Sequence, residues 1–501
     1  MRLNHKQIAT YTGGSFVVSP IDAAELMRGV TWDSREVEPG WLYVALPGER
    51  TDGHVFVASA LRAGARAALV SEMPDAATCA LARELGASVI EVPNTAAAIT
   101  DLARAWRGHL KGRVIGLTGS TGKTTTKNLV RDVAAAGLSV VATKANQNNE
   151  LGVPRTLLAA DPDTQVVVVE MGMRGLGQIA ALCDFVRPDW GLITNVGESH
   201  IELLGSRENI ARAKAELIAA LPKGSGVAFL NAADDMADFV WDTSGLRAWG
   251  NERVSFNGAG AAAQPCVWAE GVELDDEGRP RFTLCARGFA PVPTNASAST
   301  PLAVADTDAD GAAVERAACH LSLRGMHNVH NACAAAAVGR RLGLSLDVVA
   351  RALERSVPES GRQEVITARG GFTIVNDAYN ANPDSMRASL STFCALSVRG
   401  RRVAVLGDMG ELGDFARACH EGIGRMAATL PLDMLICVGE LSEHIAAAAE
   451  EAGMDESRVV RARTVADVLE VLDAYLEKDD AVLVKASHFM GLTRVVEGLV
   501  S

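Results

Sequence analysis

A glycine-rich turn between a short apolar strand and a helical stretch constrains the fold more than any other feature of this chain. The strand is expected at 113–117, the turn reads TGSTGKTT at 118–125, and the helix should end near Gly137. Glycine lets the backbone approach an anion closely, and the free N–H groups at a helix N-terminus point toward that anion. The arrangement is typical of a phosphate-binding loop at the edge of a parallel β-sheet.

The side chains of this loop suit a magnesium triphosphate. Lys123 supplies a positive charge for the β- and γ-phosphates, and the Thr124 hydroxyl is a candidate Mg²⁺ ligand. Leu117 stands where the strict motif has a glycine, so the loop is a variant of the type. The alternative, a glycine-rich turn with a chance lysine, explains the strand-turn-helix context less well. The expected nucleotide contacts of the loop are Gly119, Ser120, Thr121, Gly122, Lys123, Thr124 and Thr125.

Length and patterning indicate a three-domain α/β protein. The chain has 501 residues, of which 48% are apolar, and domains usually hold about 100–200 residues. Short apolar runs near Val140, Val168 and Ile193 alternate with helical stretches, which predicts a parallel sheet covered on both faces. The expected units are 1–110, 111–357 and 358–501.

The units differ in their expected elements. In the first unit, ASALRAGARAALV at 58–70 is helix-like. The central unit carries an Ala-rich helix at 328–342 and, within a stretch of different composition at 257–321, a loop-like insertion near 290–315. In the third unit, alternating strands and helices predict a dinucleotide-fold layout. Its strands are expected near 372–375, 403–406, 435–438 and 481–484.

Composition excludes several classes of protein. Lys and Arg number 48 against 61 Asp and Glu, a net charge of -13, which argues against the broad basic face that nucleic-acid binding requires. The nine cysteines form no C-x-x-C pair, so they predict neither a zinc site nor a disulfide framework. No apolar run approaches the ~18 residues of a membrane helix, and no secretory signal is evident. We expect a cytoplasmic protein that is not embedded in a membrane.

Polar residues just beyond two strands are further candidates, each with a plain alternative. Glu170 ends an apolar strand, where a carboxylate beside a phosphate loop can hold Mg²⁺; the alternative is a surface or helix-capping residue. His200 and Lys214 follow the next strand. A lone histidine is more often a packed residue than a ligand, and a lone helical lysine is usually solvated.

Later motifs carry amide and charged side chains. NNELGVP at 148–154 and HNVHNACAA, with Asn328 and Asn331, offer amides for phosphate, ribose or base edges, although Asn also simply forms turns. Arg362 in SGRQE can clamp a γ-phosphate, and Asp377 in DAYNANPDSM can accept hydrogen bonds from ribose hydroxyls.

Together these motifs resemble those of the Mur ligase family, the ATP-dependent amide-forming enzymes of peptidoglycan synthesis. The resemblance implies a central P-loop parallel-sheet domain flanked by a small N-terminal α/β domain and a C-terminal Rossmann-like domain. DAYNANPDSM and LGDMGELG favour the member that joins D-alanyl-D-alanine to UDP-N-acetylmuramoyl-tripeptide, and the DNPR-like motif of MurE members is missing. The matching motifs are, in order, WDSR, DGHVF, TGSTGKTT, NNELGVP, EMG, NVGESH, AKAEL, HNVHNA, SGRQE, DAYNANPDSM and LGDMGELG.

The resemblance also implies roles for single residues. Thr124, Glu170 and His200 fall where the family holds Mg²⁺. Lys214 matches a lysine that several members carbamylate; the alternative is an unmodified lysine paired with acidic neighbours or phosphate. The remaining implied contacts are Asn149 and Arg362 with the γ-phosphate, Asn331 with the adenosine, Asp377 with the ribose, and Ser34, Arg35 and His54 with the UDP-sugar substrate.

The implied reaction begins with transfer of the ATP γ-phosphoryl group to the tripeptide carboxylate. The amine of D-alanyl-D-alanine then attacks the acyl phosphate and phosphate leaves. Catalytic roles fall to Lys123, Lys214, His200 and Arg362, the third unit is expected to close over the site, and the family suggests a monomer. Alternatives are a MurE-like or folylpolyglutamate synthase-like ligase and, from another class, a P-loop switch or motor. The third residue of the tripeptide, meso-diaminopimelate or lysine, stays open.

Overall fold

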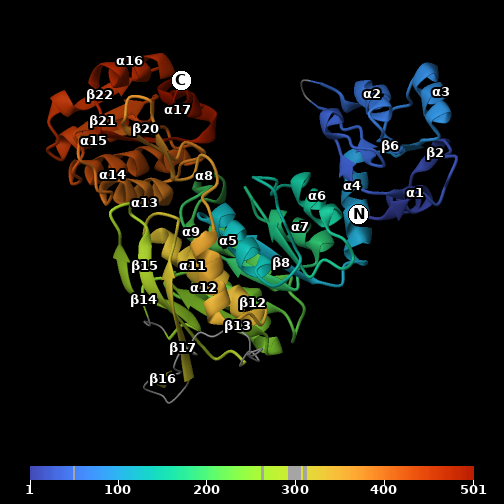
Figure 1. Cartoon of the computed structure of the whole chain (residues 1–501), viewed down its shortest axis with the longest axis horizontal. Coiled ribbons are helices and arrows are strands. Elements are labelled where there is room, and N and C mark those ends of the chain that lie inside the picture. Colours follow the sequence, from blue (N-terminus) through green and yellow to red (C-terminus); the bar gives the residue numbers. More distant parts are fainter. Residues whose placement is uncertain (49–50, 261–263, 291–305, 308–312, 501) are drawn as a thin grey trace.

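The computed structural model describes residues 1–48, 51–260, 264–290, 306–307 and 313–500. Three α/β units follow one another along the chain. Figure 1 shows the N-terminal unit in blue and the C-terminal unit in red on opposite sides of the molecule, with the central unit between and below them. Within the described ranges, every helix is too short or too polar to span a lipid bilayer. All nine cysteines carry free thiols.

The N-terminal unit is built on a five-stranded sheet in the order β2-β7-β6-β5-β4, parallel except for β2. A two-stranded antiparallel sheet, β1-β3, lies beside it. The strands are β1 Leu3–Asn4, β2 Ser15–Val18, β3 Leu26–Met27, β4 Val30–Thr31, β5 Leu42–Val44, β6 Ala67–Val70 and β7 Ser88–Glu91. The helices are α1 His5–Thr12, α2 Val57–Arg62, α3 Ala76–Leu85 and α4 Thr95–Arg107, with short 3₁₀ turns at Ser34–Glu36 and Gly53–Phe56.

The prediction of a helix over 58–70 is wrong in its second half. Helix α2 ends at Arg62, and Ala67–Val70 forms the fully buried strand β6. Gly64 makes the break because its φ of +109° is a conformation that only glycine adopts readily. A short run of small apolar residues has no periodicity that separates a buried strand from a buried helix.

Helix α4 connects the first unit to the second and packs on both. Its Trp106 Nε1 donates to the carbonyl of Ala160 at 2.9 Å, and Arg107 Nε donates to the carbonyl of Val186 at 2.9 Å. These carbonyls end helices α6 (Gly152–Ala159) and α7 (Gln178–Val186) of the central unit.

The central sheet has ten strands in the order β16-β17-β15-β14-β13-β12-β11-β8-β10-β9. It is parallel from β9 to β14 and antiparallel beyond β14. The four strands expected from the sequence are confirmed as β8 Arg113–Thr118, β9 Val140–Ala142, β10 Val166–Glu170 and β11 Trp190–Ile193. The others are β12 Val227–Asn231, β13 Glu252–Asn257, β14 Val267–Leu274, β15 Pro280–Arg287, β16 Asp306–Thr307 and β17 Ala313–His320.

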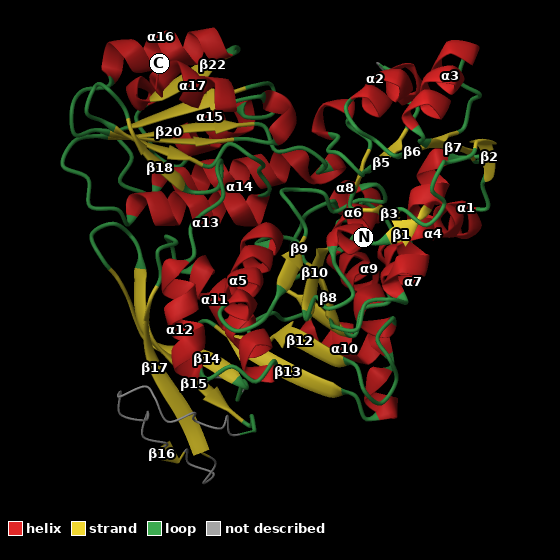
Figure 2. Ribbon diagram, turned by 45° about the vertical axis from the view of Figure 1, so that its right-hand side comes forward, coloured by secondary structure: helices red, strands yellow, loops and turns green. Residues whose placement is uncertain are grey.

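Helices cover both faces of this sheet, as the apolar runs predict. Along β10, Val166 and Val168 belong to one hydrophobic cluster, whereas Val167 and Val169 belong to another. Figure 2 shows α5 (Lys123–Ala135), α11 (His327–Arg341) and α12 (Leu346–Arg355) side by side on the first of these clusters. The remaining central helices are α5 Lys123–Ala135, α8 Ile201–Leu204, α9 Arg207–Ala219, α10 Ala237–Ser244, α11 His327–Arg341 and α12 Leu346–Arg355.

Most of the expected insertion near 290–315 lies outside the described residues. Its last part is not a loop, because residues 313–315 begin β17. Val314 is buried and pairs with Arg287 of β15 in an antiparallel register, which extends the sheet past the expected boundary.

The C-terminal unit has a six-stranded sheet in the order β18-β19-β23-β20-β21-β22, parallel except for β18. The four predicted strands are confirmed; β18 and β22 were not predicted. The strands are β18 Glu364–Thr367, β19 Thr373–Asn376, β20 Arg402–Gly407, β21 Met434–Val438, β22 Val459–Ala462 and β23 Ala481–Lys485. The helices are α13 Pro383–Cys394, α14 Ala416–Ala428, α15 Glu443–Glu451, α16 Val465–Tyr475 and α17 Thr493–Val500.

Candidate active site

The loop between β8 and α5 presents unpaired backbone donors. In the described part of the chain, the N–H groups of residues 122–125 have no hydrogen-bond acceptor. The N–H groups of Ser120 and Thr121, by contrast, both donate to Asn195 Oδ1, at 3.2 and 2.9 Å. Asn195 therefore fixes the start of the loop while the first turn of α5 is left open for an anion.

Two glycines are required by the shape of this loop. A Cβ on Gly119 would lie 1.8 Å from Thr194 Oγ1, and a Cβ on Gly122 would lie 2.7 Å from Asn331 Oδ1. Gly122 also has a φ of +71°, in the left-handed region. Larger residues at either position would displace the loop from β11 or α11.

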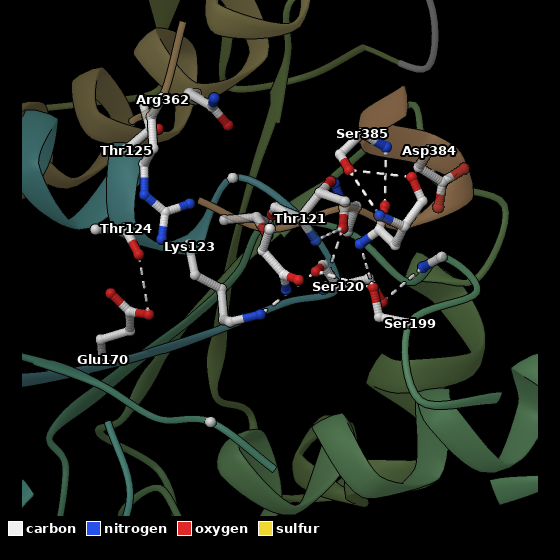
Figure 3. Close-up of a pocket in the computed structure, with 18 of the residues that line it drawn as sticks. Ser120, Thr121, Lys123, Thr124, Thr125, Glu170, Ser199, Arg362, Asp384 and Ser385 are labelled. Atoms are coloured by element: carbon white, nitrogen blue, oxygen red, sulfur yellow. Dashed lines mark hydrogen bonds between the residues drawn. The ribbon is translucent and has the colours of Figure 1, made fainter. Parts of the chain in front are cut away.

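Two cations face the open turn. Lys123 Nζ donates to the carbonyls of Gly119 and Ser120, at 2.8 and 3.3 Å, and burial lowers its pKa, partly opposed by the charge of Glu170. Figure 3 shows Arg362, from the C-terminal unit, extending toward the first turn of α5. The guanidinium of Arg362 stacks on Tyr379, 4.1 Å from the ring centroid. The structure thus brings the predicted phosphate ligands of two units together.

Thr124 and Glu170 lie together beside the loop. Glu170 Oε1 accepts from Thr124 Oγ1 at 3.2 Å and from Asn148 Nδ2 at 2.9 Å. Glu170 is 1% exposed, and its Oε2 has no hydrogen-bond partner within the described residues. An unpaired buried carboxylate oxygen next to a threonine hydroxyl fits the all-oxygen ligand set that Mg²⁺ prefers. Asn148 was missed as a site residue, although it stands in the same motif as Asn149.

His200 faces the C-terminal unit. Its Nδ1 lies 2.5 Å from Glu411 Oε2, and Arg174 Nη2 lies 3.0 Å from Glu411 Oε1. The contact with His200 is the main reason why the pKa of Glu411 is lowered. Glu411 belongs to the motif GDMGELG, so this contact joins the central unit to a motif that the sequence had left without a role.

A hydrogen-bonded chain also links the C-terminal unit to the phosphate loop. Asn382, which caps α13, donates from Nδ2 to Ser199 Oγ at 2.6 Å. Ser199 Oγ in turn donates to the carbonyl of Ser120 at 3.2 Å, as drawn in Figure 3.

Lys214 is enclosed under the loop. It is 1% exposed and has no hydrogen-bond or ion-pair partner among the described residues. Burial lowers its pKa well below the usual value, and the charge of Lys123 acts in the same direction, against Asp234. An unpaired buried amine is costly as a cation, so the surroundings favour a neutral nitrogen.

The expected nucleoside contacts lie on the far side of the loop. Asn331 Oδ1 accepts from Thr126 Oγ1 at 3.0 Å, and its Nδ2 donates to Asn328 Oδ1 at 2.9 Å. Asp377 accepts from Lys485 Nζ at 2.8 Å and from Gln363 Nε2 at 2.9 Å. Lys485 was missed, but a lysine at the carboxyl end of a buried parallel strand was a signal that could have identified it.

The remaining predicted residues have other surroundings. Asn149 Oδ1 accepts from the N–H of Gly152 at 2.9 Å, so it shapes the start of α6 as well as lining the cavity. Ser34, Arg35 and His54 lie on the N-terminal unit, away from the phosphate loop. Arg35 pairs with Asp33 at 2.6 Å, while His54 Nδ1 meets Asp52 at 2.6 Å and its Nε2 accepts from the N–H of Ser71 at 2.9 Å.

One cavity of about 1690 Å³ gathers the nucleotide residues. Apart from Thr100 of α4, its walls come from the central and C-terminal units, and no described residue before Thr100 contributes to it. Its members among the predicted residues are Ser120, Thr121, Gly122, Lys123, Thr124, Thr125, Asn149, Glu170, His200, Asn331, Arg362 and Asp377. Gly119, Lys214, Ser34, Arg35 and His54 do not line it.

The fold and this site define a nucleotide-binding enzyme assembled from a P-loop domain and a second α/β domain. Comparison with known families matches three successive segments of the chain. The description "Mur ligase family, catalytic domain" matches residues 27–107, "Mur ligase middle domain" matches 117–339, and "Mur ligase, glutamate ligase domain" matches 361–488. The chain belongs to the Mur ligase family.

Within the family, its relatives are UDP-N-acetylmuramoyl-tripeptide--D-alanyl-D-alanine ligases, or MurF. Those of Mycobacterium leprae and Mycobacterium tuberculosis (strain H37Rv) are 37% and 38% identical, over 99% and 100% of this chain and 97% and 98% of the relatives. Among solved structures, MurF from Acinetobacter baumannii has a TM-score of 0.80 at 29% identity, covering 100% of this chain and 99% of that one. MurF from Thermotoga maritima in complex with ADP has a TM-score of 0.72 at 26% identity, covering 94% and 97%.

Proposed function

We propose that this protein joins D-alanyl-D-alanine to the tripeptide carboxylate of UDP-N-acetylmuramoyl-tripeptide, with ATP converted to ADP and phosphate. The observation that carries the proposal is the open turn of α5, which has four unpaired N–H groups and toward which Arg362 of the C-terminal unit extends (Figure 3). The full-length similarity to ligases of that name supports the choice of substrates.

The residues of the cavity account for the energetic demands of the reaction. Carboxylate and triphosphate repel each other, and Lys123 and Arg362 offset that repulsion from two sides of the γ-phosphate. The N–H groups of residues 122–125 stabilise charge on the phosphate oxygens as it develops. The acyl phosphate that forms on the tripeptide is then attacked by the neutral amine of D-alanyl-D-alanine, the C–N bond forms, and inorganic phosphate leaves.

The residues also fit Mg²⁺. Thr124 and Glu170 would hold it, because Glu170 Oε2 is buried without a partner beside the Thr124 hydroxyl. His200 stays a proposed third ligand: its Nδ1 lies 2.5 Å from Glu411 Oε2, which leaves Nε2 for the metal and lets the carboxylate orient the ring. When bound, Mg²⁺ supplies charge neutralisation on the triphosphate.

For Lys214 we propose a carbamate, formed when the neutral amine adds to CO₂ and releases a proton. The buried, unpaired nitrogen with a lowered pKa supports this proposal. Lys214→Ala should lower turnover, and bicarbonate or a short-chain carboxylic acid should partly restore it. Turnover that stays low with every added acid would instead favour an unmodified lysine.

The proposal also assigns ligand contacts, domain boundaries, a location and an oligomeric state. We assign Ser34, Arg35 and His54 to the UDP-sugar, Asn149 to the γ-phosphate, Asn331 to the adenosine and Asp377 to the ribose. We place domain boundaries after residues 110 and 357. We propose a cytoplasmic location, since ATP and a nucleotide-linked sugar are the substrates, and a monomer, as the family resemblance suggests.

The decisive experiment measures phosphate release from ATP and the UDP-tripeptide with one amine at a time. D-Alanyl-D-alanine should be required, while meso-diaminopimelate, glutamate and buffer alone should release little. Release that depends on glutamate or a diamino acid, or that needs no acceptor, would overturn the assignment.

A further inference from the structure

We propose that Lys485 is a positioning residue for the nucleotide ribose, acting by holding the carboxylate of Asp377 at the cavity wall. The inference rests on the proposed function, because it takes Asp377 as the ribose ligand. Lys485 is the last residue of β23, and Asp377 directly follows β19, the parallel neighbour of β23. The carboxyl ends of two adjacent strands therefore bring these charges together.

The ammonium of Lys485 is fully occupied by protein oxygens. Its Nζ donates to Asp377 Oδ2 at 2.8 Å and to the carbonyl of Asn380 at 2.9 Å, and the carbonyl of Asp377 lies 3.5 Å away. The side chain is 2% exposed. Because an ammonium has three protons, these three oxygens leave none for a ligand. Although Lys485 lines the cavity, its three protons are directed at these protein oxygens, so it acts through Asp377 and the loop that follows it.

The contacts of Asp377 leave one direction open. Its Oδ2 accepts from Lys485 Nζ and from Gln363 Nε2 at 2.9 Å, and its Oδ1 accepts from the N–H of Gln363 at 3.3 Å. A carboxylate offers about four acceptor positions, so the free one belongs to Oδ1. Asp377 lines the cavity, and this free position is the one available to a ribose hydroxyl.

Stability alone is a weak reason for this buried pair. Desolvation of two charges offsets most of their attraction, and apolar side chains of similar volume often serve equally well. The pair does fix geometry, because the same ammonium holds both Asp377 and the carbonyl of Asn380. Tyr379, which lies between them, supports the guanidinium of Arg362. Lys485 thus positions both Asp377, at the ribose end of the cavity, and the segment that carries Tyr379, at its phosphate end.

The test compares the affinities for ATP and 2′,3′-dideoxy-ATP, measured by titration calorimetry with Mg²⁺ and without an acyl acceptor. The wild-type protein should bind the dideoxy nucleotide about 10-fold or more weakly, the value of hydrogen bonds to a charged group. In Lys485→Met, that ratio of dissociation constants should shrink toward one. Lys478→Met changes an exposed lysine of the same unit and should keep the wild-type ratio.

A purely structural role for Lys485 predicts something different. Both nucleotides would then lose affinity by the same factor in Lys485→Met and the ratio would stay as in the wild type, which would overturn the inference. A wild-type protein that binds both nucleotides equally would overturn it too. Neither result concerns the amine acceptor, which only the phosphate-release assay tests. Failure of the proposed reaction is therefore distinguishable from failure of this inference.

A second comparison covers the case in which Lys485→Met does not fold, since it leaves a buried carboxylate unpaired. The double variant Lys485→Met/Asp377→Asn removes both charges and is compared with Asp377→Asn alone. If Lys485 acts through Asp377, both variants show the same reduced ratio. A difference between them would mean that Lys485 acts on the nucleotide by another route.

Discussion

At the scale of single residues, Lys123 is the side chain on which the phosphate assignment depends most. Lys123→Ala should reduce kcat by at least ~10²-fold, because it removes a charge that stabilises the transferring phosphoryl group. Steady-state phosphate release with saturating substrates measures this. Lys223→Ala, at an exposed lysine of the same unit that stacks on Trp249, is the matched control. Near-normal turnover in Lys123→Ala would show that the loop does not cradle the triphosphate.

His327 gives a prediction for stability against pH. Burial lowers the pKa of His327 to about 4 from an ordinary value of 6.5, although Asp377 opposes the shift. The unfolded chain therefore binds this proton at a higher pH than the native protein does. The contribution of His327 to stability is complete above pH 6.5 and is lost as the pH falls toward 4.

Between pH 7 and pH 5, this histidine alone should cost the ligand-free protein about 2 kcal/mol of unfolding free energy. Urea unfolding of the wild type and of His327→Gln at both pH values isolates the effect, since the variant keeps a polar side chain that does not titrate. If the wild type and His327→Gln lost the same unfolding free energy between pH 7 and pH 5, His327 would be protonated in the native state at pH 5, or exposed.

The sequence identified the charged residues of the candidate site more readily than the residues that pair with site residues. Lys123, Glu170 and Arg362 were predicted because each follows a strand or stands in a motif, and all three line one cavity. Glu411 and Lys485 were not singled out, because their roles arise from contacts with His200 and Asp377, which are far from them in the sequence. Long-range pairing of this kind has no local pattern, although the position of Lys485 at the end of a buried parallel strand was a local signal.

At the scale of elements, the segment between β15 and β17 is expected to be dispensable. Arg287 and Val314 are paired neighbours in the antiparallel ladder, so deletion of 292–312 leaves five residues to join them. Hairpin connections of about this length are common. The deletion keeps Phe289, on which Arg340 stacks, and Glu315, which pairs with Arg340 at 2.5 Å.

Turnover and melting temperature of this deletion variant should stay close to those of the wild type. Removal of residues 313–320 instead would take away β17, which leaves the edge of β15 unpaired and α12 without the strand it packs on, so it serves as the comparison expected to unfold the unit. Lost activity in the shorter deletion, with an unchanged melting temperature, would assign that segment a part in the reaction.

The elements themselves were predictable where an apolar run met a glycine or a polar turn. Strands β8, β10 and β11 satisfy that condition, and so does the alanine-rich α11. β18 was missed because it is half-exposed and lacks a continuous apolar run, and 58–70 was assigned to a helix because small residues suit both structures. In both cases, pairing with neighbouring strands of the sheet determined the secondary structure.

At the scale of the whole molecule, the separation of the units argues for a closing movement. Apart from Thr100 of α4, the cavity is built from two units, whereas the residues proposed for the UDP-sugar lie on the N-terminal unit and contribute nothing to it. The C-terminal unit already contacts the segment after β11, where Asn382 donates to Ser199 and Glu411 lies against His200. The acyl phosphate is open to hydrolysis unless water is excluded, so the N-terminal unit must approach before chemistry begins.

We therefore expect the radius of gyration in solution to fall when the UDP-tripeptide and a non-hydrolysable ATP analogue bind together. Small-angle X-ray scattering measures the change, and the nucleotide alone should produce a smaller one because it contacts only the two units that already share the cavity. Arg155 of the central unit pairs with Glu36 of the N-terminal unit at 2.5 Å. Arg155→Ala therefore tests whether this contact between the two units affects the change in radius. A radius that is unchanged by both ligands, at concentrations that support full turnover, would mean that the substrate peptide spans the distance between the units without closure.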